Sequence, residues 1–304
     1  MDSKRSASSR IRGAIGLIKP SDDAHALPSV QRVFSGMTKE STPWKVYHGD
    51  ASDILQTLPE NRFSCVITSP PYFWQRDYSA KGQIGQESSI DEYVDAISNT
   101  MDGVKRVLSK DGVLFLNLGD TYYSAKGQPK GEDRKNSARR FGLRAVDASG
   151  LGVPRKTTIG MPWRVALQMI ERGWVLRSPI IWRRDGSIPE PTAHDRPWRT
   201  YESVFMFSKS PRYYFNRKGL GAEEDIWTIS SRPKNNNGQH SAAFPDELVE
   251  RCLGIGCRKG GEVLDPFAGT GTVLRVAALS GHPSTGIDIS LKYAKYMKDE
   301  MTAH

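Results

Sequence analysis

SCVITSPPY, residues 64–72, is the stretch of sequence that decides the fold. Its first half is a short apolar run that ends at Thr68, and such a run is typical of a buried strand. Pro70 and Pro71 cannot continue the strand, because proline lacks a backbone N–H and fixes φ. The sequence therefore predicts a rigid, extended turn at the carboxyl end of a strand, where ligands bind in open α/β sheets.

The predicted turn presents two acceptors and an aromatic ring. Ser69 offers a hydroxyl oxygen, the carbonyl of Pro70 is not needed by a strand ladder, and Tyr72 offers a flat ring. These groups suit a planar substrate with an exocyclic amine, because two acceptors on its N–H groups would aim the nitrogen lone pair at an electrophile. A proline-terminated strand end with a buried tyrosine is the better explanation of an isolated motif, so a second motif has to decide.

GEVLDPFAGTGT, residues 261–272, is that second motif. Its pattern predicts a strand, a tight glycine turn and the start of a helix, and the strand predicted at residues 284–289 carries Asp288 near its end. This order matches the front half of a Rossmann-like nucleotide site, in which such an acid binds ribose hydroxyls. The two motifs together favour a catalytic turn beside a nucleotide pocket.

The glycine motif also indicates which nucleotide it holds. Residue 274 is Leu, where the dinucleotide fingerprint needs Gly or Ala, and the loop has no lysine to bind phosphates. A nucleoside without phosphates, held through its ribose and a small charged tail, remains. S-adenosylmethionine is therefore the predicted cofactor, because its sulfonium methyl group is the electrophile that a positioned amine requires.

Composition excludes several classes of protein and favours a polyanionic partner. The chain has 304 residues, 25% of them charged and 38% hydrophobic, with a formal net charge of +9. Its cysteines form no CxxC pair or Cys/His cluster, so we predict no metal site and a reducing compartment. No stretch is long and apolar enough to span a membrane, and no signal peptide is expected. A cytoplasmic, nucleoid-associated protein without membrane contact is the expectation.

The order of the predicted elements indicates one α/β domain over residues 44–304. A helix with an apolar stripe over residues 90–108 joins the strand at residues 64–68 to the strand at residues 113–118. Strand, helix and strand in this order form a βαβ unit, so the central sheet is predicted to be mostly parallel. Residues 1–43 are basic and have little to bury, and we expect a disordered arm there.

Two polar segments interrupt this order, residues 121–158 and residues 208–240. The first is rich in Lys and Arg, which favours contact with phosphate groups, although a solvated surface loop has the same composition. One or both segments would recognise a nucleic-acid target. The candidate DNA contacts are Trp74, Arg76, Arg139, Arg140, Arg183 and Arg184.

With both motifs in view, the chain resembles a β-class amino DNA methyltransferase of the N4-cytosine group, of bacterial restriction-modification type. The catalytic motif precedes the glycine motif, which is the circularly permuted order of that class and separates it from protein-glutamine methyltransferases. The resemblance implies a Rossmann-like, S-adenosylmethionine-dependent fold and identifies Ser69, Pro70, Pro71 and Tyr72 as catalytic. The cofactor-binding residues that it implies are Asp50, Ala51, Phe244, Pro245, Asp265, Pro266, Phe267, Ala268, Gly269, Thr270, Gly271, Thr272 and Asp288.

The identity of the methylated base rests on Ser69. Adenine-N6 enzymes of this kind usually carry Asp or Asn before the prolines, so Ser69 favours cytosine N4 and leaves adenine N6 as the alternative. Methylation at cytosine C5 would need a cysteine thiolate, whereas Cys65 lies inside the apolar strand. An RNA methyltransferase and a catalytically silent nucleic-acid-binding protein are further alternatives. The expected partner is double-stranded DNA with its target base flipped out, and a cognate restriction endonuclease is a candidate partner. The oligomeric state is not predicted.

Overall fold

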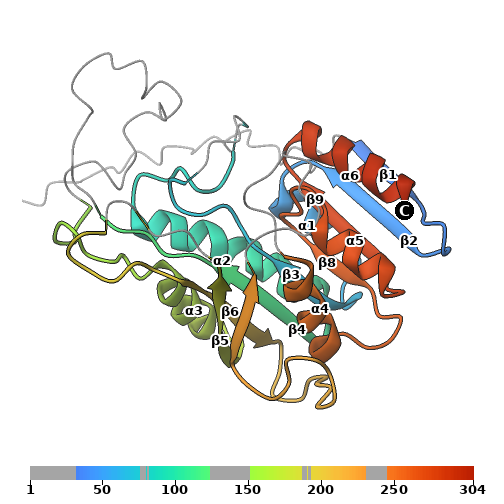
Figure 1. The fold of residues 1–304 in the computed structure, drawn as a ribbon. Helices are drawn as coiled ribbons and strands as arrows, with labels where there is room; N and C mark the ends of the chain where they lie inside the picture. The colour runs from blue at the N-terminus through green and yellow to red at the C-terminus, as the bar shows by residue number, and fades with distance from the viewer. Residues whose placement is uncertain are drawn as a thin grey trace, which may run out of the picture.

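The computed structural model describes residues 32–75, 80, 82–123, 151–186, 190, 193–230 and 245–304. Within these ranges a single sheet of nine strands has helices on both of its faces (Figure 1). The strands follow the order β1-β2-β9-β8-β3-β4-β6-β5-β7. The strands are β1 (Arg32–Met37), β2 (Pro43–His48), β3 (Phe63–Thr68), β4 (Leu108–Leu118), β5 (Val175–Asp185), β6 (Tyr201–Ser208), β7 (Ile226–Ser230), β8 (Val263–Asp265) and β9 (Ser284–Asp288). The helices are α1 (Ala51–Thr57), α2 (Ile90–Val107), α3 (Met161–Glu171), α4 (Asp246–Gly256), α5 (Thr272–Leu279) and α6 (Leu291–Ala303).

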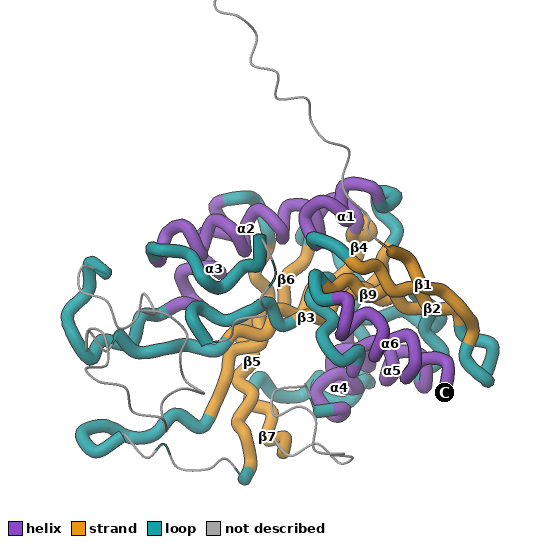
Figure 2. The backbone as a smooth tube through the Cα atoms, turned by 90° about the horizontal axis from the view of Figure 1, so that it is seen from above, coloured by secondary structure: helices purple, strands orange, loops and turns teal. Residues whose placement is uncertain are grey.

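The sheet is mostly parallel, as the βαβ pattern predicts. Strands β2, β9, β8, β3 and β4 run parallel to one another, whereas β6 lies antiparallel between β4 and β5. Helices α1, α2 and α3 cover one face and α4, α5 and α6 cover the other, which gives three layers (Figure 2). The α/β, Rossmann-like fold class is therefore confirmed.

The catalytic motif and the glycine motif are far apart in the sequence but lie on neighbouring strands. Strand β3 ends at the catalytic turn and β8 ends at the glycine loop, and Val66 pairs with Leu264 between them. Because the two strands are parallel, both loops leave the sheet at the same edge, which we call the catalytic edge. The permuted order of the motifs thus converges on one place in the fold.

The N-terminal boundary predicted at residue 43 is wrong. Residues 32–37 form β1, which pairs antiparallel with β2 from Arg32 opposite His48 to Met37 opposite Pro43. The side chains of β1 are exposed or half-buried, so backbone pairing rather than burial holds this edge strand. Composition did not reveal it for that reason. Residues 1–31 of the predicted arm lie outside the described residues.

The two predicted recognition segments are described only in part. Residues 124–150 and 231–240 lie outside the described residues. Because β6 is antiparallel to β4, Ser208 lies opposite Val113, at the edge of the sheet away from the catalytic turn. The chain that follows stays there, since the backbone N–H of Tyr214 donates to the carbonyl of Asp111. The first part of segment 208–240 is therefore wrongly placed for reading a base beside Tyr72.

No helix among the described residues has both the length and the apolar character needed to cross a membrane.

Candidate active site

The catalytic turn follows β3 directly and is anchored from α2. The hydroxyl of Tyr93 donates a hydrogen bond of 2.9 Å to the carbonyl of Pro71. Among the described residues, no hydrogen-bond donor is assigned to the carbonyl of Pro70, as expected for an acceptor kept for a substrate. The ring of Tyr72 lies on Gly119, where a Cβ atom would stand only 2.6 Å from the ring. Only glycine fits at that position while the tyrosine keeps its place.

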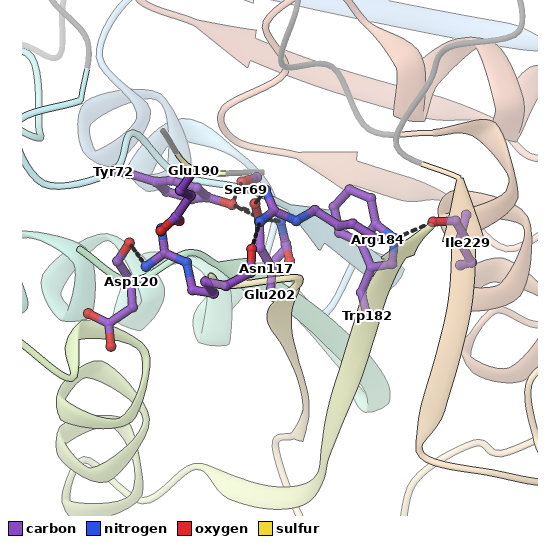
Figure 3. A network of polar contacts seen from close by, with 10 residues as sticks. Ser69, Tyr72, Asn117, Asp120, Trp182, Arg184, Glu190, Glu202 and Ile229 are labelled. Atoms are coloured by element: carbon purple, nitrogen blue, oxygen red, sulfur yellow. Dashed lines mark hydrogen bonds and ion pairs between the residues drawn. The ribbon is translucent and has the colours of Figure 1, made fainter. Parts of the chain in front are cut away.

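A polar network of buried and part-buried side chains holds the Tyr72 hydroxyl (Figure 3). Ser69 donates to Tyr72 Oη over 3.1 Å, and Tyr72 Oη donates to Glu202 Oε2 over 2.7 Å. Asn117 Nδ2 donates to both Tyr72 Oη and Glu202 Oε2, at 2.8 and 3.0 Å. Burial, followed by the nearby Glu202 charge, raises the pKa of the Tyr72 phenol well above its ordinary value. The phenol therefore keeps its proton.

Sequence reasoning missed Asn117 and Glu202. Asn117 lies in an otherwise apolar strand, and a lone buried polar residue at the end of such a strand was a signal that could have identified it. Glu202 comes from β6, 130 residues after Tyr72 in the chain. No local pattern marks it, because only the antiparallel return of β6 beside β4 brings it to the catalytic edge.

The glycine motif forms a compact loop around Asp288. The Asp288 carboxylate accepts the backbone N–H of Gly269 at 2.8 Å and that of Ser290 at 2.7 Å. Gly269 and Gly271 have φ of 53° and 82°, a region that favours glycine. A Cβ atom on Gly271 would also come within 2.7 Å of the Met297 side chain. The loop geometry therefore depends on both glycines.

Asp265 joins the two loops rather than lining the pocket. Its carboxylate accepts the Thr68 hydroxyl at 2.7 Å and the backbone N–H of Phe267 at 3.0 Å. Thr68 is the last residue of β3, so this buried contact fixes the catalytic turn relative to the glycine loop. Burial raises the pKa of Asp265 and of Asp288 to about 7. Hydrogen bonds to each carboxylate oppose that rise without cancelling it.

A cavity opens between the catalytic turn and the glycine loop, and it brings together residues from both motifs. Asp50 borders it from the start of α1, where its side chain also accepts the backbone N–H groups of Ser52 and Asp53 at 2.8 and 3.3 Å. The residues that line the cavity are Asp50, Ala51, Ser69, Pro71, Gly82, Gln83, Ile84, Pro266, Phe267, Gly269, Asp288 and Ile289.

Several predicted cofactor residues do not line this cavity. Residues 82–84 and Ile289 do line it and were missed, since nothing in their local sequence resembles a nucleotide motif. Phe244 lies outside the described residues, and Pro245 precedes α4 as its N-cap residue. The predicted residues that belong to the loop but are absent from the lining are Asp265, Ala268, Thr270, Gly271 and Thr272.

The predicted DNA contacts occupy different environments. The Trp74 indole N–H donates to the carbonyl of Glu87 at 2.6 Å, so this half-buried ring is held within its own loop. Arg183 is exposed on β5. Arg184 is directed into the protein, where it pairs with Glu202 at 3.3 Å and donates to the carbonyl of Arg199 at 2.9 Å. Arg76, Arg139 and Arg140 lie outside the described residues.

The comparison with known proteins decides the family. The model of the N6/N4 DNA methylase family matches residues 63–299, which contain the catalytic turn and the glycine loop. The chain belongs to this family. The methylase is 35% identical over 283 residues to the type II methyltransferase M.Cfr9I of Citrobacter freundii, covering 90% of this chain and 93% of that one. It is 36% identical over 268 residues to M.SmaI of Serratia marcescens, covering 84% and 90%.

Solved structures have the same fold as the methylase. The PvuII DNA methyltransferase (cytosine-N4-specific) aligns with a TM-score of 0.66 at 21% identity, over 88% of this chain and 94% of that one. The M1.HpyAVI–SAM complex aligns with a TM-score of 0.54 at 16% identity, over 85% and 98%.

The methylase is thus a DNA methyltransferase of restriction-modification type that uses S-adenosylmethionine. The cavity fits this cofactor, because the buried Asp288 carboxylate lies at one end of it and the Ser69 turn at the other. C5 chemistry has no support from Cys65, which is fully buried and whose thiol pKa is raised well above its ordinary value by burial.

Proposed function

We propose that this methylase transfers the methyl group of S-adenosylmethionine to the exocyclic N4 amine of cytosine in double-stranded DNA. Residue 69 is the observation that carries the base assignment. Its hydroxyl proton is directed at Tyr72 Oη, so its remaining lone pairs can accept an amine N–H. A serine rather than an acid or an amide at this position is what the N4-cytosine group of the family carries.

The geometry supports catalysis by positioning. Ser69 and the carbonyl of Pro70 would hold the two N–H groups of the amine, and the ring of Tyr72 would stack on the base. The amine must leave the duplex to reach them, because it is otherwise paired. Its nitrogen would then attack the sulfonium methyl group in line, and the cofactor would lie in the cavity beside the turn. The Asp288 end of the cavity would receive the ribose hydroxyls.

Isotope transfer tests the proposal. Unmethylated duplex DNA is incubated with the methylase and methyl-labelled S-adenosylmethionine, and the digested nucleosides are analysed by mass spectrometry. We expect the label in N4-methylcytosine. Label in N6-methyladenine would overturn the base assignment and keep the chemistry, whereas label in 5-methylcytosine would overturn both. Parallel reactions with duplex RNA test the alternative substrate.

We further propose that the chain between β5 and β6 contacts DNA. Its described part, residues 193–200, lies at the catalytic edge, because Ser203 of β6 pairs with Leu118 at the end of β4. The side chain of Trp198 is 51% exposed there. The Arg196 guanidinium lies 3.7 Å from the centroid of the Tyr122 ring, and Arg199 donates to the carbonyl of Asp120. A fixed loop thus presents an exposed indole beside cations, which suits stacking on an unpaired base.

Trp198→Ala is expected to raise the Kd for target DNA about tenfold, because one base–aromatic stack contributes about 1–3 kcal/mol. The Kd for S-adenosylmethionine should not change. Fluorescence anisotropy with labelled duplex and calorimetry with the cofactor measure the two constants. Phe215→Ala is the matched control, since Phe215 is 37% exposed and follows Tyr214 at the opposite edge of the sheet. Equal weakening by both variants would reject the loop as a DNA contact.

The kinship with type II methyltransferases also suggests a biological setting. We propose that a restriction endonuclease with the same target sequence is the partner activity in the cell, where the methylase protects resident DNA in the cytoplasm. The protective role predicts that DNA methylated by this protein resists cleavage by that nuclease.

A further inference from the structure

The direction of each hydrogen bond around Tyr72 follows from which atoms can donate. Tyr72 Oη has one proton and three neighbours in the network. Asn117 Nδ2 can only donate, and a carboxylate oxygen of Glu202 can only accept. The single phenol proton must therefore go to Glu202, and the phenol oxygen must accept from Asn117 and from Ser69. Glu202 thus determines which way the Ser69 proton points.

The other oxygen of Glu202 is also occupied by a donor. Arg184 places its guanidinium 3.3 Å from Glu202 Oε1, while Tyr72 and Asn117 both donate to Oε2. The site therefore needs an acceptor at both ends of one side chain, which a carboxylate supplies and an amide does not. With glutamine at this position, an NH₂ group would face either the Arg184 guanidinium or the pair of donors from Tyr72 and Asn117.

The consequence reaches the substrate amine. If Glu202 did not accept the phenol proton, that proton could turn toward Ser69 Oγ. Ser69 would then accept from Tyr72 and point its own proton toward the substrate. A serine that donates repels the amine N–H instead of binding it, and the nitrogen lone pair would lose its alignment.

We propose that Glu202 is a positioning residue of the methyl transfer. It acts through the Tyr72 hydroxyl and keeps Ser69 as a hydrogen-bond acceptor for the target amine. The proposal rests on the proposed function of the catalytic turn and adds a residue from β6, outside both motifs. It does not depend on which amine, cytosine N4 or adenine N6, is methylated.

A double-mutant cycle tests this inference, with Glu202→Gln, Tyr72→Phe and the double variant. The assay counts methyl groups transferred to duplex DNA, whichever base carries them, so a wrong base assignment does not affect it. We expect Glu202→Gln to lower kcat about 10- to 100-fold, as for a lost hydrogen bond to a charged group. The KM values for DNA and S-adenosylmethionine should stay within about twofold. In the Tyr72→Phe background the same change should lower kcat by less than about twofold, because the hydroxyl through which Glu202 acts is gone.

Glu262→Gln is the matched control. Glu262 is also a part-buried carboxylate paired with an arginine, Arg62, at 2.6 Å. It lies just before β8, at the edge away from the turn, and should leave kcat unchanged. An unchanged kcat in Glu202→Gln would overturn the proposal, as would an equal loss of kcat in the wild-type and Tyr72→Phe backgrounds. If Glu202→Gln does not fold, Tyr72→Phe alone decides, because it breaks the same contact and must lower kcat with both KM values kept.

Discussion

Ser69→Ala is expected to lower kcat by about 100- to 1,000-fold, the loss found when one preorganised hydrogen-bonding group is removed from an active site. The hydroxyl is the acceptor that Tyr72 and Glu202 orient, and alanine leaves one amine N–H without a partner. Binding should be almost unaffected, because the cofactor cavity retains the rest of its lining and the DNA surface is unchanged. Single-turnover methyl transfer at saturating cofactor and DNA measures the chemical step, and titration calorimetry measures the two Kd values.

Ser64→Ala provides the comparison for Ser69→Ala. Ser64 lies in the same strand at its opposite end, where its backbone N–H donates to the carbonyl of Glu262. Removing its hydroxyl should leave turnover within about twofold of wild type, as for most substitutions away from a site. Losses of similar size in binding and in turnover with Ser69→Ala would contradict the role assigned to the hydroxyl, because they would indicate a damaged fold.

The sequence predicted the two motif loops correctly because each motif is local. Two prolines must end β3 at Thr68, and left-handed glycines must shape the loop after β8. The parallel order followed from the βαβ pattern, which placed both loops at one edge. These inferences need only residues that are close in the chain and the geometry of a parallel sheet.

What the sequence could not predict depends on long-range pairing. Glu202 reaches Tyr72 only because β6 inserts antiparallel between β4 and β5. Residues 82–84 line the cavity because their loop returns over the turn, where the backbone N–H of Trp74 donates to the carbonyl of Gly85 at 2.7 Å. Neither feature has a periodic or compositional signal. Arg184 misled for a related reason, since a charged residue at a strand end suggests a surface contact until its ion pair with Glu202 is known.

The affinity for S-adenosylmethionine is expected to fall as the pH is lowered below about 7, because burial raises the pKa of Asp288 to about 7 in the unliganded protein. The ribose hydroxyls donate, so they need the ionised carboxylate as acceptor. Below pH 7 the cofactor must first displace a proton, and the Kd should rise toward about tenfold per pH unit. Above pH 7 the Kd should level off. Calorimetric titrations from pH 5.5 to 8.5 measure this profile.

Asp288→Asn and Asp265→Asn separate the two buried acids that share a pKa of about 7. Asp288→Asn should weaken cofactor binding at pH 8 and make the Kd independent of pH. Asp265→Asn should keep the pH profile, because Asp265 contacts Thr68 and Phe267 and does not line the cavity. For either acid, the folded protein binds its proton more tightly than the unfolded chain. The free energy of unfolding of the unliganded methylase should therefore decrease as pH rises from about 4 to 7. A pH profile that persists in Asp288→Asn and disappears in Asp265→Asn would assign the titrating group to the loop junction instead of the ribose site.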